Sequence, residues 1–154
     1  MSETLSVTAI KNGTVIDHIT QGQATRIIHL LALKSGKNKI TIGLHLPSKR
    51  IGLKDIIKIE DRALTEDEAN EIVVFAPEAT INVIENFIVV RKIKTHLPDF
   101  MKGVFSCPNP VCITQAETVE SYFHVSQHNK LIKLLCHYCD RIFDREHVKL
   151  KIYP

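Results

Sequence analysis

Four cysteines in the last third of the chain constrain its fold more than any other feature of the sequence. They form two short pairs, Cys107 with Cys112 in CPNPVC and Cys136 with Cys139 in CHYC. Two tight turns that each present two thiolates are the usual frame of a tetrahedral zinc site. Because four thiolates fill the coordination sphere, no position remains for water or substrate. The spacing therefore predicts one structural Zn²⁺ ion per chain rather than a catalytic metal.

Other uses of these cysteines fit the sequence less well. Disulfides form in oxidising compartments, and the N-terminal residues MSETLSVTAI have no apolar signal-peptide core. A redox CxxC motif opens a helix after a buried strand, which Cys136 and Cys139 are not expected to do. Four histidines near the cysteine pairs could act as substitute ligands, but four thiolates already complete the site. We therefore expect these histidines on the surface: His124, His128, His137 and His147.

The composition limits the class of partner. A length of 154 residues fits one ordinary domain or two small ones. The formal net charge of +3 is too small for the basic face of a dedicated nucleic-acid-binding protein. No apolar run reaches the length of a transmembrane helix. We expect a cytoplasmic protein that binds neither nucleic acid nor membrane.

Residues 1–98 alternate between strand and helix patterns. In residues 40–46 every second side chain is Ile or Leu, which predicts a half-buried strand. Thr65 and Glu68 are spaced as a capping box, which opens a helix that ends before Pro77. The other expected elements are strands at 5–10, 14–19 and 53–60, a helix at 21–34, and a hairpin over 79–92 that bends near Glu85 and Asn86.

The order of these elements predicts an α+β fold. Strand, helix, strand, strand, helix, strand is the split-βαβ or ferredoxin-like arrangement, with both helices on one face of an antiparallel sheet. The other face is then available to a partner. Residues 99–154 are expected to form a small β zinc-ribbon domain, because a piece this short rarely buries enough apolar surface to fold without a metal. The tail KLKIYP could add a strand, make an interface contact or fray.

No catalytic constellation is evident. Asp17 and His18 are adjacent, but neighbours on a regular strand point to opposite faces and cannot form a relay. The sequence has no phosphate-binding loop, dinucleotide fingerprint, nucleophile elbow or HExxH motif. We therefore expect a binding protein rather than an enzyme.

Lysines suggest where a ligand could bind. Lys54 and Lys58 lie on one face of the same expected strand, about 13 Å apart. Lys92 ends the last strand, so a split-βαβ sheet can bring all three near Asp17 and His18. Ammonium groups there could hold phosphates while a carboxylate reads a base or ribose. Spacing alone favours the simpler view that these are solvated surface lysines.

Several motifs together point to a known family. NGTVIDHI, ITIGLHLPS, GLKDIIKIE, FAPEATINVIENF, CPNPVC and CHYC occur in one order along essentially the whole chain. In this respect the chain closely resembles the regulatory chains of aspartate carbamoyltransferase. The resemblance implies a chain without activity of its own, in which residues 1–98 bind the inhibitor CTP or the activator ATP, with UTP reinforcing CTP in some members. Residues 99–154 would dock onto catalytic chains that condense carbamoyl phosphate with aspartate. Regulatory chains would pair through their N-terminal domains, and three such dimers would join two catalytic trimers.

The resemblance also implies roles for individual residues. Lys58 would contact base or ribose, Lys92 the phosphates, and Lys54 a second nucleotide position. The rest of the effector pocket would be Ala9, Ile10, Val15, Asp17, His18, Asn82, Ile84 and Val89. The contact with the catalytic chain would involve Asn109, His137, Tyr138, Asp140 and Arg141. Three positions depart from the familiar pattern, because Thr8 replaces an acidic residue, Phe87 a tyrosine and Val111 a polar residue. The first two bear on the balance of CTP and ATP effects, and the third on one hydrogen bond between subunits.

Two other functions remain as alternatives. A zinc-ribbon nucleic-acid-binding protein would carry a contiguous basic face and aromatic stacking groups, and would bind with steep salt dependence. A free-standing nucleotide sensor would need no other chain. Zinc-dependent capture by catalytic trimers distinguishes the regulatory chain from both.

Overall fold

The computed structural model describes residues 9–32 and 36–151. The chain forms two compact units, Met1–His96 and Leu97–Pro154. The strand expected at 5–10 lies mostly outside the described residues, and residues 9 and 10 belong to no strand. In the described part of the chain, no helix combines the length and apolar character needed to cross a bilayer.

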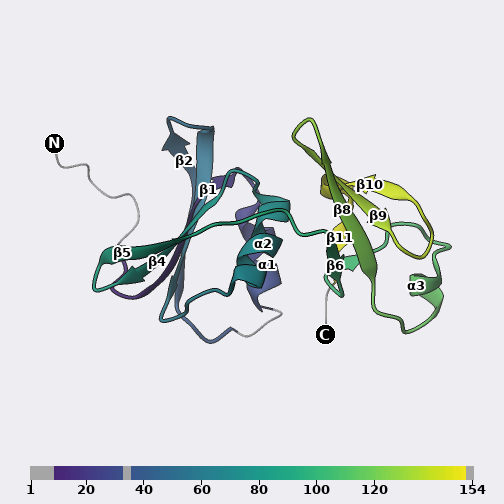
Figure 1. Ribbon diagram of the computed structural model, residues 1–154, viewed down its shortest axis with the longest axis horizontal. Helices are drawn as coiled ribbons and strands as arrows, with labels where there is room; N and C mark the ends of the chain where they lie inside the picture. Colours follow the sequence, from purple (N-terminus) through teal and green to yellow (C-terminus); the bar gives the residue numbers. More distant parts are fainter. Residues whose placement is uncertain (1–8, 33–35, 152–154) are drawn as a thin grey trace. The chain divides into compact units, whose positions relative to one another are not determined.

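The first unit is an antiparallel sheet with two helices on one side (Figure 1). Its described elements are β1 Gly13–Thr20, α1 Ala24–Ala32, β2 Ile40–Ser48, β3 Gly52–Glu60, α2 Glu66–Phe75, β4 Thr80–Glu85 and β5 Ile88–Ile93. The strand order is β2-β3-β1-β4-β5. Four of these strands follow the split-βαβ order, and β5 adds an edge beside β4. The predicted α+β fold class is confirmed.

Local sequence chemistry accounts for α2. The hydroxyl of Thr65 accepts a hydrogen bond from the Glu68 amide at 3.2 Å, and Glu68 Oε1 accepts one from the Thr65 amide at 3.2 Å. This reciprocal pair satisfies two amides that the first helical turn leaves unbonded. The helix ends at Phe75, before Pro77, and its Ile72 side chain has no exposed surface. The predicted capping box is confirmed.

The β4–β5 hairpin forms where the sequence predicted it. Asn86 and Phe87 connect the strands with φ values of 50° and 66°, the left-handed conformations of a tight primed hairpin turn. A bulky residue such as Phe87 rarely adopts this conformation. The bend predicted near Asn86 is therefore confirmed, with an aromatic side chain held at its tip.

The strand β2 differs from its prediction. It is an edge strand, and the side chains of Ile40, Ile42 and Leu44 are 36%, 43% and 50% exposed. Of the nine residues of β2 described here, only Gly43 is buried. The expectation of a half-buried strand was wrong, because alternation identifies an apolar face without showing that another layer covers it.

The second unit contains a four-stranded sheet of order β10-β9-β8-β6 and a small sheet of β11 and β7. Its described elements are β6 Phe100–Lys102, β7 Phe105–Ser106, α3 Ile113–Ala116, β8 Tyr122–His128, β9 Leu131–Cys136, β10 Ile142–Asp144, a 3₁₀ turn Arg145–His147 and β11 Lys149–Leu150. Phe105 and Phe123 are fully buried and meet edge to face, with centroids 5.8 Å apart. The C-terminal tail thus contributes a short strand through Lys149–Leu150.

Candidate effector site and metal centre

A row of aligned residues crosses the whole N-terminal sheet. Lys58 is the strand partner of Thr41 on one side and of Val15 on the other. Val15 in turn pairs with Asn82, and Asn82 with Lys92. Directly opposed residues in an antiparallel sheet project to the same face. The sheet therefore brings Val15, Lys58, Asn82 and Lys92 together, as the pocket prediction requires.

This row lies on the face opposite the helices. The residues next to it along the strands, Ile16, Ile57 and Ile81, have no exposed surface. Since α1 and α2 lie on one side of the sheet (Figure 1), the buried isoleucines belong to the face that the helices cover. Because successive side chains of a strand alternate between faces, the row points away from that core. One face of the sheet is thus used for stability, and the other collects polar and charged groups.

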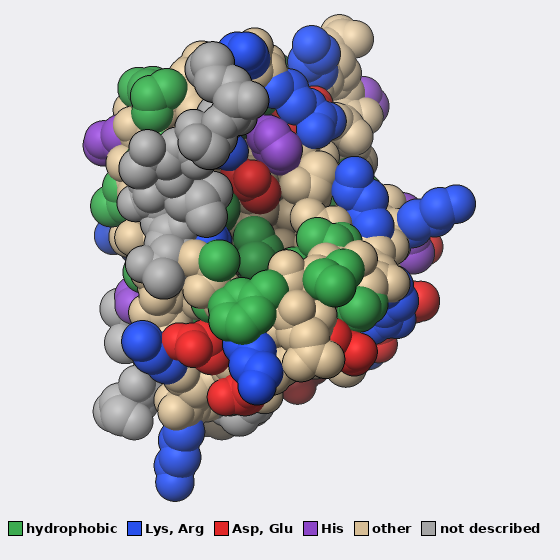
Figure 2. Space-filling model, turned by 90° about the vertical axis from the view of Figure 1, so that its left-hand side faces the viewer, with side chains coloured by type: hydrophobic (Ala, Val, Ile, Leu, Met, Phe, Trp, Pro, Cys, Tyr) green, Lys and Arg blue, Asp and Glu red, His purple; other side chains and the backbone are tan. Residues whose placement is uncertain are grey.

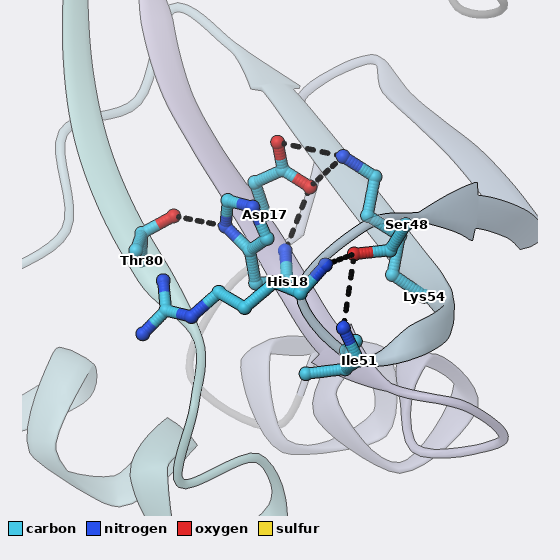
Figure 3. A network of polar contacts seen from close by, with 7 residues as sticks. Asp17, His18, Ser48, Ile51, Lys54 and Thr80 are labelled. Atoms are coloured by element: carbon cyan, nitrogen blue, oxygen red, sulfur yellow. Dashed lines mark hydrogen bonds and ion pairs between the residues drawn. The ribbon is translucent and has the colours of Figure 1, made fainter.

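Asp17 joins this face to a second lysine. The carboxylate accepts hydrogen bonds from Lys54 Nζ at 2.9 Å and from the His18 amide at 2.7 Å (Figure 3). The side chains of Asp17 and Lys54 are 22% and 20% exposed, so the pair is partly shielded from water. Lys54 is therefore placed by Asp17 rather than extended into solvent.

His18 corrects an expectation drawn from the sequence. Its φ of 56° marks a bulge, and the β1–β3 pairing shifts between Ile16 and Ile19. His18 Nδ1 lies 3.0 Å from the hydroxyl of Thr80, which is the strand partner of Asp17. Because of the bulge, Asp17 and His18 do not point to opposite faces, and both reach the same part of the site (Figure 3).

Lys58 is the lysine of the row whose surroundings change its pKa. Its side chain is buried, with 7% of the residue exposed. Burial lowers the pKa of Lys58, and the carboxylate of Asp17 opposes this by raising it. A lysine that is shielded from water interacts more strongly with an incoming anion than a solvated one does.

The other predicted pocket residues are close in sequence to these elements. Ile10 is buried and Ala9 exposed, just before β1. Ile84 and Val89 are strand partners at the hairpin end of the sheet. Thr8 lies outside the described residues. Figure 2 views the molecule from the side where β4 and β5 lie in Figure 1, and hydrophobic side chains gather on its surface. The most exposed apolar residues of the hairpin are Phe87, Ile88, Val89 and Val90.

Asp55, a buried residue that holds several backbone amides in place, was missed by the sequence analysis. Asp55 has no exposed surface, and its carboxylate accepts hydrogen bonds from the amides of Gly22 at 3.0 Å, Ala24 at 3.3 Å and His45 at 3.1 Å. It thereby fixes the start of α1 and a bulge of β2. The signal was present, because Asp55 alternates with Ile57 on the buried face of β3, where an unpaired carboxylate would be costly.

The four cysteines meet in the second unit. Their sulfurs all lie within 4.8 Å of one another, and the pairs Cys107–Cys139 and Cys112–Cys136 are each separated by 3.8 Å. None of the four forms a disulfide. Thiolates placed about 2.3 Å from a tetrahedral zinc ion are about 3.8 Å apart, so the donor set fits such an ion. The histidines lie outside this cluster, as expected.

The thiol groups differ in their readiness to ionise. Burial raises the pKa of Cys107 and of Cys136. Burial also opposes ionisation of Cys139, but hydrogen bonds from the Asn109 side chain and the Arg141 backbone lower its pKa to about 7. Cys139 is thus the natural first thiolate, and a cation would have to displace the protons of the buried thiols.

The predicted interface residues surround this centre. His137, Tyr138, Asp140 and Arg141 are exposed around the second cysteine pair. Asn109 is only 5% exposed, and its side-chain oxygen accepts a hydrogen bond from the Val111 amide at 3.2 Å. Asn109 therefore shapes the CPNPVC loop from within, whereas the Val111 side chain of that loop is 81% exposed.

Comparison with known proteins decides the family. Residues 5–96 match the model described as the aspartate carbamoyltransferase regulatory chain, allosteric domain, and residues 99–149 match its metal binding domain. The chain belongs to the aspartate carbamoyltransferase regulatory chain family. Relatives named as such include those of Chromobacterium violaceum, 48% identical over 95% of this chain and 96% of the relative, and Tolumonas auensis, 48% identical over 92% of each. The Vibrio cholerae regulatory chain is 45% identical over 92% of each.

Membership of the regulatory chain family agrees with the structure. The family is regulatory rather than catalytic, in line with the absence of a catalytic constellation from the sequence. The allosteric match covers the unit that holds the row from Lys58 to Lys92, here called the lysine row, and the metal-binding match covers the unit that holds the four sulfurs. The family also accounts for the joining of these two units in one chain, which neither site explains alone.

Proposed function

We propose that the chain is the allosteric subunit of an aspartate carbamoyltransferase, with residues 1–98 as the effector domain and residues 99–154 as the docking domain. CTP inhibits, ATP activates and UTP reinforces CTP. The observation that carries the proposal is the row from Lys58 to Lys92 on one face of the sheet. The shielded ammonium group of Lys58 suits a phosphorylated ligand better than a solvated lysine would, and Lys92 adds an exposed positive charge on the same face.

Each polar group in the row has a part in this proposal. Lys92 binds phosphates, Lys58 contacts the base or ribose, and Lys54 serves a second nucleotide position. Asp17 holds Lys54 and accepts hydrogen bonds from the ligand. Apolar contacts come from the strand ends and the hairpin, and the remaining pocket residues are Ala9, Ile10, Val15, His18, Asn82, Ile84 and Val89.

The second unit binds Zn²⁺ through Cys107, Cys112, Cys136 and Cys139. Four sulfur donors at tetrahedral spacing favour zinc among common cellular metals. The ion performs no chemistry on substrate and instead shapes the two loops that meet the catalytic chain. His137, Tyr138, Asp140 and Arg141 supply that surface directly, and Asn109 orders the neighbouring loop.

Assembly follows the family arrangement, with three regulatory dimers joining two catalytic trimers. The regulatory chains pair through their N-terminal units. The exposed apolar side chains of the edge strands β2 and β5 support such pairing, because exposed apolar strands at sheet edges favour association. Regulation requires that CTP bind the low-activity assembly more tightly than the high-activity one, with a typical coupling of about 1–3 kcal/mol.

A substitution at Lys58 tests the effector site. We expect Lys58→Met to keep the packing of the buried lysine stem and to abolish the CTP response of carbamoyltransferase activity in a complex with catalytic trimers. Assembly, measured by analytical ultracentrifugation, should be unchanged. Lys39→Met, which removes an exposed lysine 3.6 Å from Glu60, is the matched control and should keep the response. Loss of assembly with intact nucleotide binding in Lys58→Met would show that the roles of the two units are reversed.

A further inference from the structure

An ion pair at the end of the N-terminal sheet has no part in the pocket described above. Arg50 lies in the turn between β2 and β3, and Glu78 lies in the turn between α2 and β4. Arg50 Nη2 is 3.3 Å from Glu78 Oε2, and the two side chains are 52% and 54% exposed. Exposed pairs of this kind contribute little to stability, since water and salt screen them. Arg50 can therefore exchange this partner at small cost.

The backbone around Arg50 is well fixed. The hydroxyl of Ser48 accepts hydrogen bonds from the Arg50 amide at 3.3 Å and the Ile51 amide at 3.4 Å, and the contact with Ile51 is visible in Figure 3. Ser48 is also the strand partner of Gly52, whose φ of 85° closes the turn. The turn thus presents the arginine side chain from a defined position.

Two contacts, joined by a short stretch of sequence, connect this turn to the effector site. Glu78, the partner of Arg50, stands two residues before Thr80. The hydroxyl of Thr80 touches the His18 ring at 3.0 Å, and the neighbouring Asp17 holds Lys54 (Figure 3). The guanidinium group of Arg50 accordingly lies at the same end of the sheet as His18 and Lys54. An anion that extends from the lysine row toward this end would meet Arg50 last.

We propose that Arg50 binds the terminal phosphate of a nucleoside triphosphate held on the sheet face, and that it leaves Glu78 to do so. This inference rests on the proposed function. A guanidinium group binds phosphate through paired, charge-assisted hydrogen bonds, which are stronger than a single contact with an exposed carboxylate. Arg50 thereby makes the site distinguish triphosphates from monophosphates.

Calorimetric titration of the metal-loaded full chain with CTP and with CMP tests the inference. In Arg50→Gln, CTP binding should weaken about tenfold or more, because a hydrogen-bonded charge is lost, while CMP binding stays the same. Glu78→Gln should strengthen CTP binding and leave CMP binding unchanged, since Arg50 no longer has a competing anion. Lys49→Gln removes a charge from the neighbouring position of the same turn and should change neither affinity.

The outcomes separate this inference from the proposal on which it rests. If Arg50→Gln binds CTP within twofold of the unsubstituted chain, Arg50 is not a phosphate ligand. The proposal of an effector site on the sheet face is then unaffected. Equal weakening of CTP and CMP would show that Arg50 only supports the fold of the turn, and would also overturn the inference. If the unsubstituted chain binds no CTP, the proposed function fails and this inference fails with it.

Discussion

A single buried carboxylate orders much of the N-terminal unit. Asp55 bonds three backbone amides, from the turn before α1, from the first turn of α1 and from the β2 bulge. Substitution by alanine removes the partner of these three amides, at a position where the carboxylate itself has no exposed surface. We expect Asp55→Ala to lower the free energy of unfolding of this unit by about 2–4 kcal/mol.

Urea denaturation followed by far-UV circular dichroism measures this loss, because both long helices of the described chain, α1 and α2, belong to the unit that Asp55 orders. Glu85→Ala is the matched control, since Glu85 is an exposed acid on β4 of the same sheet, and its loss should change stability by less than about 0.5 kcal/mol. A similar small effect of Asp55→Ala would mean that water or the backbone replaces its hydrogen bonds.

Residues of this kind also mark the limit of the sequence analysis. The lysine row could be predicted, because strand periodicity assigns each side chain to a face. The position of His18 could not be predicted, because it depends on a bulge that shifts the pairing of β1 with β3. No local sequence pattern indicates such a bulge. Asp55 was overlooked even though its alternation with buried isoleucines indicated a satisfied buried carboxylate.

At the scale of elements, α2 is linked to the exit of the chain from the first unit. The side-chain oxygen of Asn70 on α2 accepts a hydrogen bond from the His96 amide at 2.9 Å, and Asn70 is 8% exposed. His96 is the last residue of that unit. A shift of α2 on effector binding would therefore move the segment that leads to the metal-binding unit.

We expect Asn70→Ala to keep CTP affinity and to reduce the CTP inhibition of the assembled enzyme, because the bond that holds the exit segment to α2 is removed. Calorimetry gives the affinity, and carbamoyltransferase assays give the inhibition. Asn38→Ala is the control, since Asn38 makes an exposed contact at 3.4 Å to the Asp61 carbonyl. Full inhibition in Asn70→Ala would exclude this link from signal transmission.

Elements differ in how far the sequence predicts them. The helix α2 and the β4–β5 turn follow from local chemistry, since the capping box and the turn residues act over a few positions. The exposure of β2 does not follow from local chemistry, because it depends on whether another layer covers this edge of the sheet. The apolar alternation of Ile40 and Ile42 was read correctly as one face, but its burial requires a partner outside the described chain.

At the scale of the whole molecule, the metal should control assembly and leave effector binding intact. The cysteines lie in the second unit and the lysine row in the first, and each unit has its own core. Because burial raises the pKa values of Cys107 and Cys136, protons compete with the metal for these sulfurs. Metal affinity should therefore rise with pH, and chelators should remove the ion more easily at pH 6 than at pH 8.

Removal of the metal by a chelator should unfold the second unit, since a domain this small depends on its metal site for stability. The treated chain should fail to form a complex with catalytic trimers in sedimentation, yet bind CTP within about twofold of the untreated chain by calorimetry. Cys107→Ser should behave like the chelated chain without any chelator present. Ser126→Ala, a change at an exposed position of β8 in the same unit, should assemble normally. Capture of the metal-free chain by catalytic trimers would show that the docking surface does not require the metal, and a parallel loss of CTP binding would show that the two units do not fold independently.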